Sequence, residues 1–304
     1  MTDMRTAPVA ADVAAAHLRL RPHVRWTPLL RTEIDGRPLV LKLEQLQRSG
    51  SFKLRGAVNA LLTGPEPKRV VTASGGNHGL GVATAAQSLG IPAVVYVPES
   101  VPEAKAAGIE AAGAKLIRHG ATYGEAAAAA LAVADESGTR YLHAYDDPDV
   151  IAGQGTATAE IVADAPDVDA IAVAVGGGGL ASGATLAADG RQVFAVEPEH
   201  CQALHAAIAA GEPVDVTIDS VAASALGATR VGELAFGILN SPAVTSVLVS
   251  DAEILAARDL LWRDFRLVVE PAAAAPLAAR LAGRVPAELP CFVLCGANTS
   301  VTFA

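Results

Sequence analysis

A regular alternation of apolar runs, glycine-rich or proline-rich turns and helix-forming stretches limits the fold more than any other feature of this sequence. In the first half of the chain, helix-forming stretches separate short apolar runs of the length that strands have. The predicted strands cover residues 70–73, 93–97, 115–118 and 141–144. Because strands joined by helices lie parallel with right-handed crossovers, this order predicts a parallel sheet with helices packed against it.

The alternation resumes in the second half of the chain, with a gap over residues 212–243, where no clear pattern is present. Further strands are predicted at residues 170–175, 193–196, 246–249 and 292–294. A chain of 304 residues exceeds the usual size of one domain, so we expect two open parallel-sheet α/β lobes around a cleft. We predict a small domain at 47–147 and a large domain formed by 1–46 and 148–304.

Charge and cysteine content narrow the class of protein. The formal net charge is -9 and no basic tract is present, which argues against nucleic acid or an anionic membrane as a partner. Cys201, Cys291 and Cys295 form no framework of paired bridges. Cys291 and Cys295 are predicted on one strand, roughly 13 Å apart at about 3.3 Å per residue, which is too far for a disulfide. Without a signal peptide or an apolar run of membrane-spanning length, we expect a cytoplasmic protein, and we expect a homodimer.

Lys53 is the first candidate for chemistry. It follows an extended apolar run and precedes a helix-forming stretch, with Ser51 as the predicted N-cap. The positive end of the helix dipole should lower the pKa of an amine in the first turn. A partly neutral lysine is a nucleophile for a carbonyl, although most single lysines are simply solvated on the surface.

Two strand-turn-helix junctions are predicted to bind anions. Gly176-Gly177-Gly178-Gly179 lies between a buried strand and a helix, where backbone N–H groups can surround a phosphate. The spacing of Gly176, Gly178 and Ala181, with Glu197 on the next strand, also fits a nicotinamide dinucleotide site. The second junction, Ser74 to Gly79, suits a carboxylate and a ring oxygen, or is only a tight turn. A nicotinamide enzyme has no evident use for Lys53 or for the second junction, whereas an aldehyde cofactor has a use for both.

Five motifs together resemble the serine/threonine dehydratase family of pyridoxal-phosphate enzymes, which share the tryptophan synthase β fold (fold type II). They occur in the family's order and span roughly residues 26–298. The motifs are Ser51-Phe52-Lys53-Leu54-Arg55-Gly56-Ala57, Ser74-Gly75-Gly76-Asn77-His78-Gly79, Gly153-Gln154-Gly155-Thr156, Gly176-Gly177-Gly178-Gly179-Leu180 and Val269-Glu270-Pro271. The resemblance implies two α/β lobes with pyridoxal 5'-phosphate in the cleft between them.

The resemblance also implies roles for individual residues. Lys53 would carry the covalent link to the cofactor, Phe52 would lie beside its ring, and Asn77 would bond the ring's 3-oxygen. The phosphate would be held by Gly176, Gly177, Gly178, Gly179 and Leu180. The substrate carboxylate would be received by Ser74, Gly75, Asn77 and His78. Cys295 would face the pyridine nitrogen, as cysteine does in the liver-type serine dehydratases.

Cys295 has a consequence for the reaction, unless it is only a buried strand cysteine. A neutral thiol is a weak donor and cannot keep the pyridine nitrogen protonated as a carboxylate would. The ring is then a moderate electron sink, which favours rapid loss of a β-hydroxyl over reprotonation. The resemblance therefore implies α,β-elimination of water from L-serine or L-threonine, giving a 2-oxo acid and ammonia.

The racemase alternative and the cation site stay open at the level of sequence. An amino acid racemase of this fold needs a second base, which is a serine in eukaryotic serine racemases, whereas here Gly75 occupies the matching position. The family's cation site would use the Glu197 carboxylate and the Cys201 carbonyl, but its third ligand matches Ala203, so a divalent ion, a monovalent ion or none is compatible. Tyr145, where relatives often have phenylalanine, is expected to influence specificity, and Asp146 and Asp147 are expected to shape the rim of the cleft.

Overall fold

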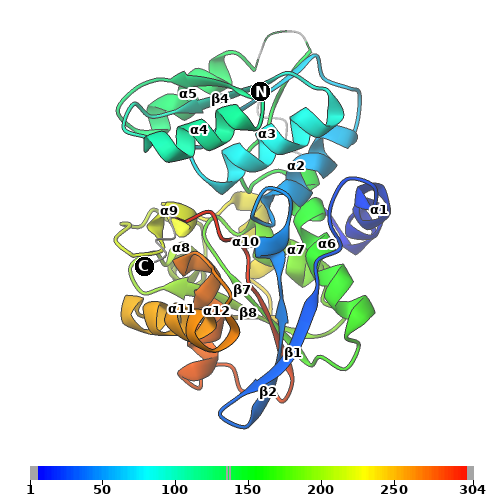
Figure 1. The fold of residues 1–304 in the computed structure, drawn as a ribbon, viewed down its shortest axis with the longest axis vertical. Helices are drawn as coiled ribbons and strands as arrows, with labels where there is room; N and C mark the ends of the chain where they lie inside the picture. The colour runs from blue at the N-terminus through cyan, green and yellow to red at the C-terminus, as the bar shows by residue number, and fades with distance from the viewer. Residues whose placement is uncertain (1–5, 135, 137, 300–304) are drawn as a thin grey trace.

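The computed structural model describes residues 6–134, 136 and 138–299 and shows two lobes, each built on its own sheet (Figure 1). The predicted α/β architecture is confirmed. The smaller sheet has the strand order β5-β4-β3-β6, and the larger has the order β1-β2-β10-β7-β8-β9. Helix α2 (Lys53–Leu62) lies at the junction of the lobes and packs against α6 (Pro148–Asp164).

In the smaller sheet all neighbouring strands are parallel. Its elements are β3 (Arg69–Ala73), β4 (Ala93–Val97), β5 (Lys115–Arg118) and β6 (Thr139–Tyr141), with α3 (Asn77–Leu89), α4 (Glu103–Ala111) and α5 (Tyr123–Ala132). Successive side chains of a strand point to opposite faces, so Val70 packs with α2 and α3 while Val71 packs with α5. Helices therefore cover both faces, which explains why the strands are apolar almost throughout.

The larger sheet is parallel except at one edge. Its strands are β1 (Leu29–Ile34), β2 (Arg37–Lys42), β7 (Ala170–Ala174), β8 (Gln192–Pro198), β9 (Val244–Val249) and β10 (Pro290–Val293). A hairpin reverses the chain between β1 and β2 at Asp35 and Gly36, whose φ angles of 51° and 70° suit a tight turn of this kind. The edge strand β1 is thus antiparallel, which the sequence analysis did not anticipate.

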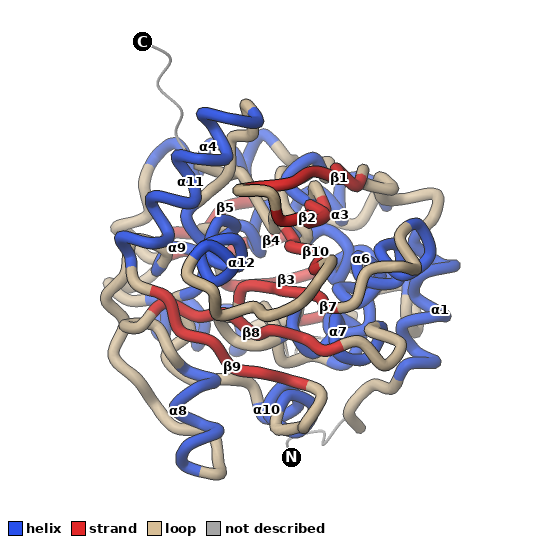
Figure 2. The backbone as a smooth tube through the Cα atoms, turned by 90° about the horizontal axis from the view of Figure 1, so that it is seen from below, coloured by secondary structure: helices blue, strands red, loops and turns tan. Residues whose placement is uncertain are grey.

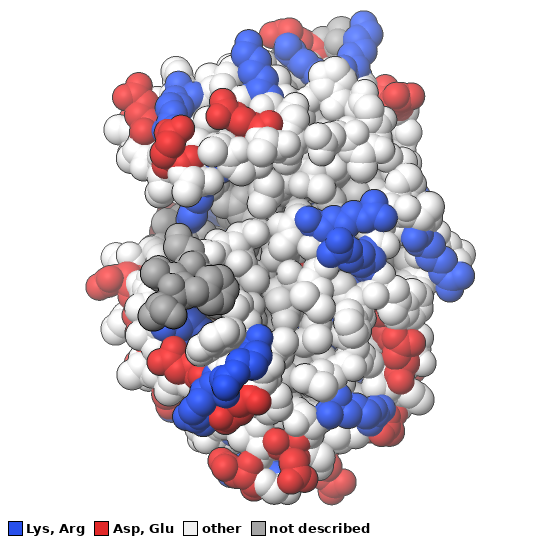
Figure 3. Space-filling model, in the orientation of Figure 1, with Lys and Arg blue, Asp and Glu red and all other residues white. Residues whose placement is uncertain are grey.

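Helices cover both faces of the larger sheet as well (Figure 2). They are α1 (Ala10–Leu20), α6, α7 (Gly179–Ala187), α8 (Ala203–Ala210), α9 (Ala223–Leu226), α10 (Glu233–Leu239), α11 (Asp251–Phe265) and α12 (Pro271–Leu281), with a short 3-10 helix, η1 (Glu44–Leu46). α12 packs on β7 and β8 with α11 behind it, while α7 packs on β7 and α6 lies against α7. Figure 3 draws the face of the molecule that Figure 1 shows. Acidic side chains are spread over both lobes on this face, and the basic side chains form no continuous surface.

Several local predictions are corrected by the structure. Helix α2 begins at Lys53 with Phe52, not Ser51, at the N-cap position, because Ser51 forms a β-bridge with Gly296. Strand β6 ends at Tyr141 rather than at 144. Strand β10 ends at Val293, so Cys295 lies beyond it, although all three cysteines are free as expected. No helix in the part of the chain that the structure describes is long and apolar enough to cross a bilayer.

Candidate active site

The Lys53 amine is held at the junction of the two lobes. Lys53 is the first residue of α2, and its Nζ donates a hydrogen bond of 2.7 Å to the carbonyl oxygen of Ala144, just after β6. Removal from water lowers the pKa of the amine from 10.5 to about 8, while the nearby Glu270 opposes the shift. The pKa falls as predicted, and removal from water is the largest cause of the shift. The Phe52 ring centroid lies 5.1 Å from Nζ.

The Asn77 side chain joins three distant parts of the sequence. It stands at the first position of α3, directly after the Ser74-Gly75-Gly76 turn. Its Nδ2 donates to Glu270 Oε1 at 2.6 Å, and its Oδ1 accepts from Asn298 Nδ2 at 2.7 Å. Glu270 is the N-cap residue of α12, and Asn298 follows β10, so both contacts are made only in the folded chain.

His78 lies next to Asn77 and is buried. Its Nε2 is 3.2 Å from the Leu142 carbonyl oxygen, which can only accept, so Nε2 carries the proton and Nδ1 does not. Burial, reinforced by the charge of Lys53, lowers the pKa of His78 to about 3, so the imidazole is neutral near pH 7. Nδ1 has no hydrogen-bond partner among the described residues.

The four-glycine turn between β7 and α7 leads directly into the start of a helix. Gly178 is the N-cap residue and has a φ of 95°, a conformation that glycine adopts without strain. The first amides of α7 have no partner within the helix and can donate to an anion. A Cβ on Gly177 would lie 2.2 Å from the Tyr145 ring, so a side chain at this position would displace the tyrosine.

Cys295 is buried, and its carbonyl oxygen accepts from the Phe52 amide at 3.0 Å. This bond fixes the segment after β10 against the start of α2. Burial raises the pKa of the Cys295 thiol well above its usual range, with the charge of Glu270 acting in the same direction. The thiol therefore stays neutral and remains the weak donor that the sequence analysis expected.

Glu197 has a clear structural role. Its two carboxylate oxygens accept the amides of Leu204 and His205 at 2.8 Å each, in the first turn of α8. Burial nevertheless raises the pKa of this carboxyl to about 8. No group of three or more His, Cys, Asp or Glu residues with metal-binding geometry occurs among residues 6–134, 136 and 138–299. The cation site at Glu197 and Cys201 therefore stays a prediction.

The two aspartates after Tyr145 cap helices. The Asp146 carboxylate accepts the amides of Glu233 and Leu234 at 3.0 Å, at the start of α10. Asp147 is the N-cap residue of α6. The Tyr145 hydroxyl donates to the Arg230 carbonyl oxygen at 3.3 Å. These contacts attach the segment that follows β6 to the larger lobe, next to the four-glycine turn.

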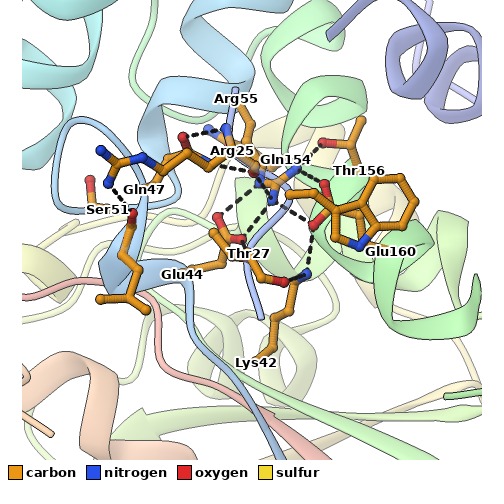
Figure 4. Close-up of polar contacts among 12 residues, drawn as sticks. Arg25, Thr27, Lys42, Glu44, Gln47, Ser51, Arg55, Gln154, Thr156 and Glu160 are labelled. Atoms are coloured by element: carbon orange, nitrogen blue, oxygen red, sulfur yellow. Dashed lines mark hydrogen bonds and ion pairs between the residues drawn. The ribbon is translucent and has the colours of Figure 1, made fainter. Parts of the chain in front are cut away.

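A cluster of buried charges around Arg55, two residues after Lys53, holds α2 in place (Figure 4). Arg55 contacts Glu44 at 2.7 Å and Glu160 at 2.7 Å, and Glu160 also contacts Lys42 at 2.5 Å. Each buried charge has a partner of opposite sign, as burial of charges requires. Because these residues come from α2, η1, α6 and β2, the cluster fixes the helix start that carries Lys53.

Sequence reasoning assigned no role to Ala144, Glu270 or Asn298. Glu270 was visible in the Val269-Glu270-Pro271 motif, where an acidic residue before a proline indicates a helix start. Its contact with Asn77 spans 193 residues, and that of Asn298 with Asn77 spans 221. No local pattern reports contacts over such separations.

The Lys53 amine has a lowered pKa, and residues 144 and 145 connect it to the start of α7, where free amides can bind a phosphate. An enzyme that holds an aldehyde cofactor on a lysine needs both features. The model of the family described as pyridoxal-phosphate dependent enzyme matches residues 20–296, and the chain belongs to that family. Pyridoxal phosphate is therefore its cofactor. This finding favours an aldehyde-cofactor site at Lys53 and the four-glycine turn over a nicotinamide dinucleotide site.

Relatives of known activity narrow the class further. The chain is similar to the L-threonine ammonia-lyase of Geobacter sulfurreducens, with 38% identity covering 88% of this chain and 69% of that protein. It is also similar to the serine racemase of Arabidopsis thaliana, with 35% identity covering 90% of this chain and 86% of that one. Among solved structures, a threonine deaminase of T.th. superimposes with a TM-score of 0.91 at 37% identity, covering 97% of this chain and 100% of that one. Maize serine racemase also gives 0.91, at 30% identity and coverage of 97% and 95%.

Proposed function

We propose that this chain is an ammonia-lyase that eliminates water from L-threonine or L-serine and yields a 2-oxo acid and ammonia. The observation that carries the proposal is the Lys53 amine, held on Ala144 with a pKa of about 8. Similarity to an L-threonine ammonia-lyase over most of the chain supports the substrate class.

The chain's own groups fit the parts that the reaction needs. When bound, pyridoxal phosphate supplies an electron-accepting ring beside the substrate's Cα. Lys53 is proposed to hold this group and, once freed, to take the Cα proton, because an amine with a lowered pKa is an effective base near neutral pH. The donors at the start of α7, from Gly176 to Leu180, would hold the phosphate. Phe52 would lie beside the ring, and the neutral Cys295 thiol would face its nitrogen.

The substrate carboxylate is assigned to the turn before α3 and its first residues. The residues are Ser74, Gly75, Asn77 and His78. Support comes from the free amides that a helix start offers to an anion and from the 13-residue length of α3. Because the neutral His78 imidazole donates its one N–H to Leu142, His78 would receive the carboxylate through its backbone amide, in the first turn of α3.

The proposal extends to the larger organisation of the protein. We place the small domain at 47–147 and the large domain at 1–46 and 148–304, since all four strands of the smaller sheet lie between residues 69 and 141. We propose a homodimer in the cytoplasm, with a monovalent or divalent cation at Glu197 and the Cys201 carbonyl as an optional addition.

A racemase is the second candidate, because serine racemases are among the similar proteins. A Cβ built on Gly75 would lie 2.6 Å from Val101 Cγ2, so neither a side chain nor space for one exists at this position. We therefore expect elimination to dominate. Chiral chromatography after incubation with L-serine separates the two activities, and D-serine accumulating faster than pyruvate would favour the racemase.

The proposed function is tested with purified holoenzyme. Borohydride should remove the visible absorbance of the bound cofactor, and mass spectrometry should place the reduced adduct on Lys53. Lys53→Ala should abolish the adduct and lower 2-oxo acid release by about 10² to 10⁴-fold, the usual contribution of a catalytic acid or base. Lys115→Ala, an exposed lysine on β5, is the matched control and should leave both unchanged. An adduct on another lysine, or no 2-oxo acid from either substrate, would refute the proposal.

A further inference from the structure

A chain of hydrogen bonds beginning at a backbone carbonyl fixes which way the Asn77 amide faces. The Ser49 carbonyl oxygen accepts from Asn298 Nδ2 at 2.9 Å, and the same nitrogen donates to Asn77 Oδ1 at 2.7 Å. Asn77 Nδ2 in turn donates to Glu270 Oε1 at 2.6 Å. Four residues from four separate segments thus form one continuous chain.

The direction of this chain follows from chemistry. A backbone carbonyl can only accept, so the Asn298 amide must present its NH₂ group to Ser49. The second hydrogen of that NH₂ group then requires an acceptor at Asn77, which places Oδ1 there and turns the Asn77 NH₂ group toward Glu270. If the Asn77 amide were flipped, its NH₂ group would face the NH₂ group of Asn298, and Glu270 would no longer accept a hydrogen bond from Asn77.

Two glycines provide the space that this arrangement needs. A Cβ on Gly50, whose φ is 72°, would lie 2.3 Å from Asn298 Oδ1, and a Cβ on Gly296 would lie 2.4 Å from Glu270 Oε1. Glu270 is 5% exposed, so water competes little for its hydrogen bonds. The Glu270 amide also donates to the Gly296 carbonyl oxygen at 3.1 Å, which holds the N-cap of α12 on the same segment.

The Asn77 NH₂ group has two hydrogens, and Glu270 uses one of them. We propose that Glu270 and Asn298 are positioning residues, which hold the Asn77 amide so that its second N–H is available to the 3-oxygen of the cofactor ring. The inference rests on the proposed function, which assigns that contact to Asn77. The inference adds that the contact of Asn77 with the 3-oxygen depends on the Glu270 carboxylate and the Asn298 amide, neither of which takes part in the reaction.

The test compares variants that keep or remove each hydrogen bond. Glu270→Gln retains an acceptor oxygen and should bind the cofactor nearly as tightly as the unmodified protein. Glu270→Met has a similar length but no acceptor and should weaken cofactor binding about tenfold, the size expected for loss of a buried hydrogen bond. Asn298→Ala, at a less buried position, should have a similar effect and provides a second variant if Glu270→Met does not fold. Glu212→Gln, an exposed carboxylate, is the control and should change nothing.

The measurements are the dissociation constant of pyridoxal phosphate and the position of its visible absorbance band, with thermal unfolding of the apoprotein as the check on folding. Each variant is also made with Asn77→Ala. If Glu270 and Asn298 act through Asn77, their effects should largely vanish in that background. Effects of equal size with and without Asn77, or a Glu270→Met variant that matches the unmodified protein, would overturn the inference. Failure of the unmodified protein to take up the cofactor on Lys53 would instead refute the proposed function.

Discussion

At the scale of single residues, the proposed chemistry depends on groups whose charge the surrounding structure suppresses. Burial lowers the pKa of Lys53 and of His78 and raises that of Cys295, and in each case removal from water is the largest cause. The site therefore holds a partly neutral amine, a neutral imidazole and a neutral thiol. This combination suits a base and weak donors better than it suits charged ligands for a metal.

The pKa of Lys53 predicts how the apoprotein captures an aldehyde. Only the neutral amine attacks a carbonyl, so the rate of pyridoxal attachment should rise with pH, reach half its plateau near pH 8, and level off above that. Stopped-flow absorbance over about pH 6 to 10 measures this rate, with N-acetyl-lysine amide as the reference amine. A midpoint near the ordinary lysine value of about 10.4 would contradict the prediction.

At the scale of elements, glycines let the central helices approach closely. A Cβ on Gly153 of α6 would lie 2.6 Å from Gly56 Cα of α2, and a Cβ on Gly183 of α7 would lie 2.4 Å from the Gly155 nitrogen of α6. Helix α6 therefore contacts both α2 and α7 through backbone atoms. Because α2 begins with Lys53 and α7 begins beside the glycines proposed to bind the phosphate, this packing sets the relative position of the two proposed anchors of the cofactor.

We predict that Gly153→Ala forces α2 away from α6. Overpacking of this kind costs about 1 to 3 kcal/mol, so the free energy of unfolding should fall by that amount in urea titrations. Cofactor affinity should fall with it, because Lys53 moves with α2.

Gly108→Ala is the matched control for this prediction. Gly108 lies in α4, and nothing lies within 4 Å of the Cβ that would be added. Glycine is a poor helix former, so this substitution should stabilise the protein by about 0.5 to 1 kcal/mol. Equal stability changes in the two variants would rule out the close approach as the cause.

At the scale of the whole molecule, buried charges join parts of both sequence halves. Arg55 of α2 is fully buried and pairs with Glu44 and Glu160, and Lys42 completes a cluster whose formal charges cancel. A cluster of this kind is weak evidence for stability as a whole, but removal of one member leaves a buried charge unpaired.

Arg55→Met should therefore lower the free energy of unfolding by about 3 to 5 kcal/mol. Glu44 and Glu160 would share Lys42 alone, and the pKa of Glu44, which Arg55 now lowers, should rise as a result. Denaturant titration with circular dichroism measures the loss. Arg31→Met is the control, since its ion pair with Asp167 is exposed and its loss should change the free energy of unfolding far less. A loss below about 1 kcal/mol for Arg55→Met would show that the cluster does not stabilise the fold.

The sequence by itself determined the class of fold and the position of Lys53 at a helix start. Apolar runs of strand length, alternating with helix-forming stretches, are local signals, so strands such as β4 and β5 were predicted with the bounds that the structure has. The glycine-rich turns were likewise visible, because only glycine fits a position such as Gly178.

Tertiary structure alone decided the surroundings that give these residues their properties. The contact of Lys53 with Ala144 spans 91 residues, and those of Asn77 with Glu270 and Asn298 span 193 and 221, so no local pattern reports them. The N-cap at Phe52 depends in the same way on the distant bridge between Ser51 and Gly296. The hairpin of β1 and β2 is different, because its Asp35-Gly36 turn is a local signal that the sequence analysis did not use. Local propensity fixes which elements form. Burial and hydrogen-bond partners set the pKa values and the orientation of each side-chain amide, and both exist only after the elements pack.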